Sequence, residues 1–298
     1  MTLLSVFAEH RWLLVAAIFL LSLLVGSFLN VVIHRLPLML EQQWKTQADE
    51  MLGHEVKPPA ERYNLVVPRS RCPKCGAEIK AHQNIPVLSW LLLGGKCANC
   101  KAPISPRYPV VELGTALLSA AVAWRFGWHW QTLAALVFTW SLVALTVIDL
   151  DHQILPDVIT LPLLWLGLLL SLAWAAGLRP PIPVDPRSAI IGGAAGYLSL
   201  WLVYWGFKLA TGKEGMGYGD FKLFGAFGAW MGWQMLPLII LLSAFSGAVI
   251  GVLMIVLRGR DRNIPIPFGP YLAAAGWIAL MWGPQLVGGY LSMTGLGR

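Results

Sequence analysis

Two aspartates stand at the edges of apolar stretches, where a charged group is costly and usually has a function. Asp149 ends one stretch, in LVALTVIDLDHQ, and Asp220 begins another, directly after GMGYG (215–219). If both stretches cross a membrane, the two carboxyl groups lie at the same depth on the same side. Two carboxyl groups that meet would share a proton, because like charges a few ångströms apart do not both ionise readily. One could then activate water while the other protonates a substrate oxygen or a leaving nitrogen.

The same two aspartates allow two other interpretations. They could relay protons or ions in a transporter, or they could cap helices without doing chemistry, since Asp220 would lie at the positive end of a helix. A transporter predicts inverted repeats and broken helices at the middle of the membrane. The chain shows no internal repeat, and its acids lie at the membrane edge. These alternatives stay open on spacing alone.

The other acidic residues near the apolar stretches are expected to have structural roles. Asp151 is two positions from Asp149, so on a helix it points away from it. Asp157 follows a proline and is expected to cap a helix N-terminus. Glu112 begins an apolar stretch and is expected to be structural, and Lys222 is expected to fix the loop or to contact lipid headgroups.

Three alternating glycines precede Asp220, namely Gly215, Gly217 and Gly219. Glycine permits a sharp turn, a close backbone approach and a positive φ. We therefore expect a loop against which an extended peptide could lie.

All four cysteines lie in one polar region, as Cys72-Pro-Lys-Cys75 and Cys97-Ala-Asn-Cys100 with 21 residues between the pairs. Two such pairs can hold one zinc ion tetrahedrally, in a closed site that has a structural role. Redox dithiols and free thiols are the alternatives, and a cytosolic location argues against disulfides. A zinc-binding assembly factor without enzymatic activity would explain the cysteines but not the glycine loop.

The composition indicates a membrane protein. Of its 298 residues, 57% are hydrophobic and 12% are charged, and the mean hydropathy is +0.64. Soluble domains carry roughly 25% charged residues. We predict an all-α polytopic membrane protein with about eight transmembrane helices and an uncleaved first span. The expected spans are 12–33, 109–125, 129–148, 158–177, 188–210, 221–234, 236–257 and 268–286.

Three regions follow from this pattern: a first transmembrane helix (1–34), a cytosolic segment with the cysteine pairs (35–108) and a transmembrane core (109–298). Within the second, 41–62 is expected to form a short polar helix and then a proline-containing linker. With the N-terminus outside, 17 of the 22 Lys and Arg residues face the cytosol. The net charge of +7 therefore reflects topology rather than nucleic acid binding, and the basic residues could contact anionic lipid.

The chain resembles the bacterial type IV prepilin peptidases, membrane aspartic peptidases with a GxGD signature. The resemblance rests on Asp149 with Pro156-Asp157, and on Gly217-Tyr218-Gly219-Asp220-Phe221-Lys222. It extends over nearly the whole chain through GSFLNVVIHRLP (26–37), CPKC, NIPVLSWLLLGGKCANC (84–100), RYPVVELGTALL (107–118) and IPIPFGPYLA (264–273).

The resemblance implies that Asp149 and Asp220 are the catalytic residues and that Cys72, Cys75, Cys97 and Cys100 bind zinc. The choice of Asp149 over Asp151 comes from the resemblance. It also implies a location in the bacterial inner membrane. The substrates would be type IV prepilins and type II secretion pseudopilins, cut after a leader glycine at the cytosolic membrane face. The new N-terminal residue would then be methylated with S-adenosylmethionine.

The residues that bind the methyl donor are not apparent from the sequence. No glycine-rich loop follows a predicted strand, so a Rossmann-type site is not expected. The Gly94-Gly95-Lys96 turn could contact cofactor or substrate, or it could only position the second cysteine pair.

Overall fold

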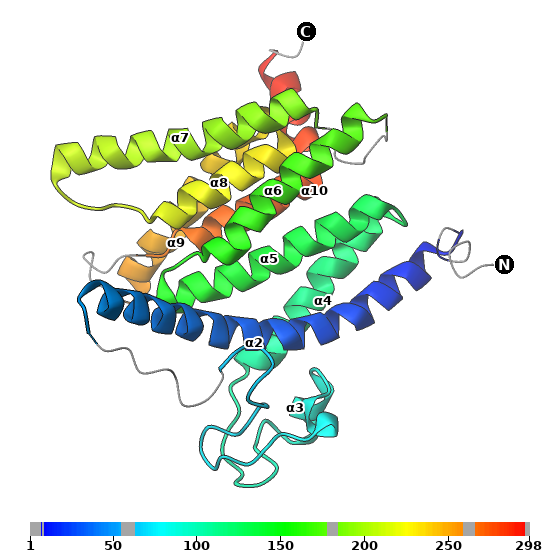
Figure 1. Cartoon of the computed structure of the whole chain (residues 1–298). Coiled ribbons are helices and arrows are strands. Elements are labelled where there is room, and N and C mark those ends of the chain that lie inside the picture. Colours follow the sequence, from blue (N-terminus) through cyan, green and yellow to red (C-terminus); the bar gives the residue numbers. More distant parts are fainter. Residues whose placement is uncertain (1–6, 8, 55–62, 178–183, 259–265, 296–298) are drawn as a thin grey trace. The chain divides into compact units, whose positions relative to one another are not determined.

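The computed structural model describes residues 7, 9–54, 63–177, 184–258 and 266–295, and in these residues the chain is built of helices (Figure 1). Two isolated β-bridges join residues within the cysteine segment, and no longer strand occurs in the described part. The predicted all-α class is therefore confirmed. The helices are α2 (Arg11–Met51), η1 (Ala81–Asn84), α3 (Leu88–Leu92), α4 (Arg107–Phe126), α5 (Trp130–His152), α6 (Asp157–Ala175), α7 (Pro186–Thr211), α8 (Tyr218–Met231), η2 (Trp233–Met235), α9 (Leu236–Arg258) and α10 (Gly269–Thr294).

Among the described residues, six helices are long and apolar enough to cross a membrane: α2, α4, α5, α6, α7 and the run Trp233–Leu257, which joins η2 to all of α9 but its last residue. Two expected spans are not among them. The helix in 221–234 has only 14 residues, which extend about 21 Å against a hydrocarbon core of about 30 Å. The helix that covers 268–286 has 26 residues but does not meet the same criteria. The prediction of a polytopic membrane protein is confirmed, and the predicted number of eight spans is not.

The first helix is longer than the sequence predicted. α2 has 41 residues and continues through Pro37 into the polar residues that were expected to form a separate short helix. Strong helix formers fill this extension, and Lys45 pairs with Glu41 one turn earlier at 2.6 Å. The expected linker falls on 55–62, outside the described residues.

The chain divides into two compact units, Met1–Ala144 and Leu145–Arg298. In the first unit α2 packs against α4. A Cβ atom at Gly26 of α2 would lie 2.7 Å from the Cα atom of Glu112, so glycine is needed for this close approach. Asn30 adds a hydrogen bond from its side chain to the carbonyl of Tyr108, at 3.1 Å.

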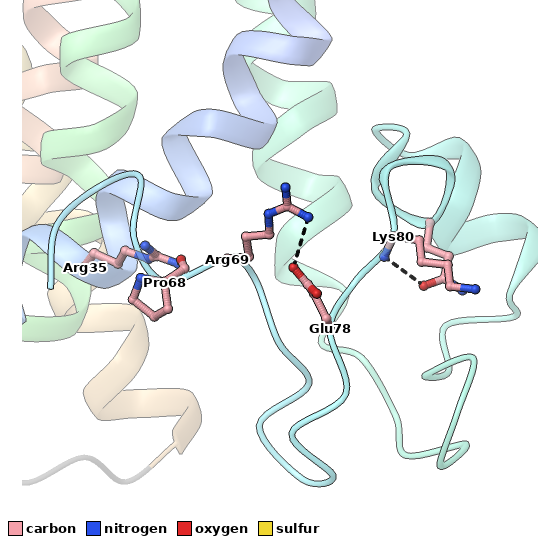
Figure 2. Close-up of polar contacts among 6 residues, drawn as sticks. Arg35, Pro68, Arg69, Glu78 and Lys80 are labelled. Atoms are coloured by element: carbon pink, nitrogen blue, oxygen red, sulfur yellow. Dashed lines mark hydrogen bonds and ion pairs between the residues drawn. The ribbon is translucent and has the colours of Figure 1, made fainter. Parts of the chain in front are cut away.

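Polar contacts tie the cysteine segment to these two helices. Arg35 of α2 is buried and donates to the carbonyls of Asn64 (2.8 Å) and Pro68 (2.6 Å), the latter shown in Figure 2. Glu112 of α4 is also buried and accepts the backbone N–H of Val87 at 2.7 Å. Both charged groups have partners, as burial requires, and the expected structural role of Glu112 agrees with this contact.

In the second unit α8 is the central element. It packs against α6 and α7 and also contacts α9 and α10 (Figure 1). From Asp220 to Met231 every side chain except that of Lys222 is buried. A helix that is apolar on all sides is an interior helix, which accounts for its high hydropathy despite its short length.

Glycines allow α7 and α8 to approach closely. Gly192 and Gly196 of α7 face Gly225 and Gly228 of α8, and a Cβ atom at Gly196 would lie 2.6 Å from the carbonyl oxygen of Phe224. Small residues four apart are typical of close helix pairs in membranes. The crossing fixes the helix whose first turn carries Asp220.

Candidate active site and metal centre

Asp149 lies in the last turn of α5 and is only 5% exposed. Its Oδ2 accepts a hydrogen bond of 3.0 Å from the backbone N–H of Gly269, the first residue of α10. Asp151, two positions further on, is exposed. The prediction that Asp151 points away from Asp149 is therefore confirmed by their burial.

Asp220 lies in the first turn of α8 and is 7% exposed. It is not the helix cap, because the N-cap residue is Gly217, which has no side chain. Its Oδ1 is buried and has no hydrogen-bond partner. The charge of Asp149 acts on it, so the two carboxyl groups are electrostatic neighbours. The structure thus brings two buried carboxyl groups, 71 positions apart in the sequence, into one polar site.

Leu155, in the turn before α6, packs against Gly219, which precedes Asp220, and against Gly269, which binds Asp149. A Cβ atom at Gly219 would lie 2.6 Å from the Cβ atom of Leu155, and one at Gly269 would lie 3.2 Å from its Cδ2. The glycine beside Asp220 is thus needed for close packing of this turn against α8.

The three alternating glycines do not use the positive φ that glycine permits. Gly217 has an extended backbone with φ −83°, and neither Gly215 nor Gly219 has a positive φ. The left-handed residue of this loop is Gly212, the C-cap of α7, with φ 71°. Gly219 therefore provides space for Leu155 rather than conformational freedom of the backbone.

The predicted cap at Asp157 was wrong. Pro156 is the N-cap of α6, and the carboxylate of Asp157 is bound by the ammonium group of Lys222, at 2.7 Å from each oxygen. Of the two roles expected for Lys222, the structure supports fixing the loop, because this ion pair joins the first turns of α6 and α8.

Gly269 is a site residue that the sequence analysis missed. Its signals were a Gly-Pro pair at the start of the last apolar stretch and its position in IPIPFGPYLA, one of the stretches on which the family resemblance rests. Glycine and proline are common where a helix starts, so this pair by itself indicates only a helix start. Its contact with Asp149, 120 positions earlier, depends on tertiary packing.

The four cysteines converge on one point in the first unit. Their Sγ atoms all lie within 4.8 Å of one another, and those of Cys72 and Cys100 are 3.8 Å apart. Zinc–sulfur bonds of about 2.3 Å place tetrahedral ligands about 3.8 Å from each other. The cysteines are not joined as disulfides. Their arrangement fits a four-thiolate metal site, and therefore the sequence prediction of a metal centre.

The two cysteine pairs have matching backbones. Gly76 donates to the carbonyl of Cys72 at 2.9 Å, and Lys101 donates to that of Cys97 at 3.0 Å. Both donors have a positive φ, 70° and 58° respectively. Hydrogen bonds from the Ala77 backbone and from Asn99 lower the pKa of the Cys75 thiol to about 6, whereas desolvation and the neighbouring thiols raise the pKa of Cys100 to about 11.

The Gly94-Gly95 turn belongs to the second pair. Both glycines have a positive φ, and a Cβ atom at Gly95 would lie 2.9 Å from the Trp90 ring. The carbonyl of Gly95 accepts the N–H of Ile104 at 2.7 Å, which closes the loop around Cys97 and Cys100. These contacts agree with a turn that positions the cysteine pair.

Comparison with known proteins covers both units. Residues 20–126 match the bacterial peptidase A24 N-terminal domain, and residues 136–252 match the type IV leader peptidase family. A Pseudomonas aeruginosa protein named prepilin leader peptidase/N-methyltransferase is 57% identical over 99% of each chain. Proteins of the same name from Stutzerimonas stutzeri (55%, over 93% of each chain) and Aeromonas salmonicida (57%, over 94% of this chain and 95% of that one) are similarly close. No solved structure matches.

Proposed function

Because the chain belongs to the type IV leader peptidase family, we propose that it is a bifunctional membrane enzyme. It cleaves the leader peptide of type IV prepilins after a glycine, as an aspartic endopeptidase. It then methylates the new N-terminal residue. The relatives' name, carried over nearly the full length of the chain, supports both activities.

The pair Asp149 and Asp220 is the proposed catalytic centre. The observation that carries this assignment is the burial of both carboxyl groups as electrostatic neighbours, with one oxygen of Asp220 left without a partner. Such a pair shares one proton. The ionised carboxylate takes a proton from water as the water oxygen attacks the peptide carbonyl carbon, and the other carboxyl group protonates the carbonyl oxygen.

The proposed substrates are helical membrane proteins with a basic leader, and they include type II secretion pseudopilins. The enzyme would lie in the bacterial inner membrane with its N-terminus in the periplasm, as the distribution of Lys and Arg indicates. Both aspartates and the cysteine segment would then face the cytosol. Basic residues of that segment would contact anionic lipid headgroups.

Zinc and S-adenosylmethionine are the proposed cofactors. The four thiols have the number and spacing that a structural zinc ion needs. S-adenosylmethionine supplies an electrophilic methyl group. The described residues contain no βαβ unit for it, and we assign no residue to its binding. We propose that the cysteine segment contributes to methylation, because it is the one sizeable polar segment on the proposed cytosolic side.

The decisive experiment measures product masses. Purified enzyme in detergent or lipid is incubated with a prepilin, with and without S-adenosylmethionine, as wild type, Asp149→Asn and Asp220→Asn. The wild type should remove the leader and add one methyl mass only with the methyl donor. Each variant should lose cleavage, because the pair acts as a unit.

Asp151→Asn is the matched control, since it removes a nearby carboxylate that is exposed. It should cleave like the wild type. Full cleavage by Asp149→Asn or Asp220→Asn would overturn the catalytic assignment. Cleavage without methylation by the wild type would remove the transferase activity from the proposal. An inactive wild type would favour a proton transporter, to be tested by proton flux in liposomes.

A further inference from the structure

α10 begins at Gly269, which has no side chain and therefore leaves room for the carboxylate of Asp149. The backbone N–H of Gly269 is a hydrogen-bond donor to that carboxylate. The Gly269 N–H lies 3.0 Å from Asp149 Oδ2. A Cβ atom on Gly269 would lie 2.6 Å from that oxygen, 3.0 Å from Asp149 Cγ and 3.2 Å from Leu155 Cδ2. Any side chain here would therefore push the carboxylate away from the N–H that holds it.

The two aspartates differ in their hydrogen bonding. Asp149 has a backbone N–H aimed at one oxygen, and an N–H donor stabilises an ionised oxygen more than a protonated one. The Gly217 backbone also donates to the Asp220 carboxyl group, but Asp220 Oδ1 is buried without a donor, which is an unfavourable place for a charge. The N-terminus of α8 favours charge on Asp220.

We propose that Gly269 is a positioning residue. Its backbone N–H holds Asp149 as the carboxylate that activates water, and Asp220 carries the shared proton. This proposal rests on the proposed function, in which the two aspartates are catalytic. It assigns distinct roles to them and gives the Gly-Pro start of α10 a role in the reaction.

The roles give a balanced reaction. Asp149 takes a proton from water as the oxygen–carbon bond forms, and Asp220 gives its proton to the carbonyl oxygen. Asp149 then returns its proton to the leaving nitrogen as the carbon–nitrogen bond breaks. Asp220 recovers a proton from a hydroxyl of the intermediate, so both groups regain their starting states.

The titratable neighbour that the structure records for Asp149 is Asp220. Within the described residues, Asp151 and His152 on the same helix are exposed, and Lys222 of α8 is bound to Asp157. A substitution at Gly269 should therefore change the pH dependence of cleavage by changing the protonation of Asp149.

The test compares Gly269→Ala with Gly288→Ala, a glycine of the same helix with nothing within 4 Å of its added Cβ. Gly269→Ala should lower kcat by roughly 10- to 100-fold at unchanged KM, because small misplacements of a reacting group cost this much. The acidic limb of its kcat–pH profile should move to higher pH, since the carboxylate has lost a donor. Gly288→Ala should match the wild type in both.

Two further measurements separate the explanations. Methylation of a pilin supplied without its leader should be kept by Gly269→Ala, which shows that the variant is folded. Asp149→Asn, run in parallel, should not cleave. A cleaving Asp149→Asn would overturn the proposed function. If Asp149→Asn is inactive, two results for Gly269→Ala would overturn the positioning role alone. One is full activity, and the other is a shift of only the alkaline limb of its kcat–pH profile.

Discussion

Gly219, the residue before Asp220, shows how one missing side chain sets the geometry of the site. A Cβ atom there would meet the Cβ atom of Leu155 at 2.6 Å and its carbonyl oxygen at 3.2 Å. Neither atom is the end of a flexible side chain, so the backbone must shift. The turn before α6 and the start of α8 would then separate, and Asp220 would move with α8.

Gly219→Ala is therefore expected to lower the rate of prepilin cleavage by at least about 10-fold. Cleavage is measured by mass spectrometry under single-turnover conditions. Gly206→Ala, at a position of α7 with nothing within 4 Å, is the control and should cleave normally. Equal rates for the two variants would contradict the packing role of Gly219.

At the scale of helices, one ion pair joins the first turns of α6 and α8. Lys222 is 25% exposed and Asp157 is 53% exposed, and their contact is bidentate. Exposed pairs contribute about 0.2–1 kcal/mol to stability. This ion pair should thus mainly fix the position of the start of α8, and it should contribute only modestly to the overall stability of the protein.

Lys222→Met and Asp157→Asn are each expected to reduce cleavage by a few fold, while the thermal unfolding temperature in detergent changes little. The double variant should be no worse than either single one, because both remove the same contact. The measurement is a double-mutant cycle on cleavage rates. Additive losses would show that the two residues act separately.

The crossing of α7 and α8 depends on glycine. A Cβ atom on Gly196 would lie 2.6 Å from the Phe224 carbonyl oxygen and 2.9 Å from its carbon. Gly196→Val should force the two helices apart and markedly lower the unfolding temperature. Gly206→Val, on α7 in open space, serves as the control for the lower helix propensity of valine. Similar unfolding temperatures for the two variants would argue against close packing at this crossing.

At the scale of the whole molecule, the proposed metal centre and the proposed catalytic pair belong to different units. The cysteines lie in Met1–Ala144, whereas Asp149 and Asp220 lie in Leu145–Arg298. The family models divide the chain in a similar way, at 20–126 and 136–252. Methylation and cleavage should therefore respond differently to damage in the cysteine segment.

Replacing Cys72 and Cys75 with serine should abolish zinc binding, because two of the four thiolates are lost. Bound zinc is measured by elemental analysis of the purified protein. The variant should lose methylation of a pilin supplied without its leader, and cleavage should be reduced less. Normal methylation by a zinc-free variant would refute the contribution of the cysteine segment to methyl transfer.

The sequence by itself determined those properties that depend on composition and local spacing. Apolar runs predicted a helical membrane protein, because backbone polar groups in lipid must be paired within each helix. The two cysteine pairs predicted a metal centre, since each pair is a local turn. The edge positions of Asp149 and Asp220 singled them out, because charge beside lipid is costly.

The tertiary structure decided which distant groups meet. Lys222 binds Asp157, 65 positions away, and Gly269 donates to Asp149, 120 positions away. The local sequence predicts a cap at Asp157 and no role for Gly269, because local patterns indicate where helices end and not which residues lie beside those ends. The sequence also predicts a transmembrane span where α8 lies, because the composition of this short interior helix is apolar. Burial among other helices and burial in lipid select the same residues, so only packing distinguishes them.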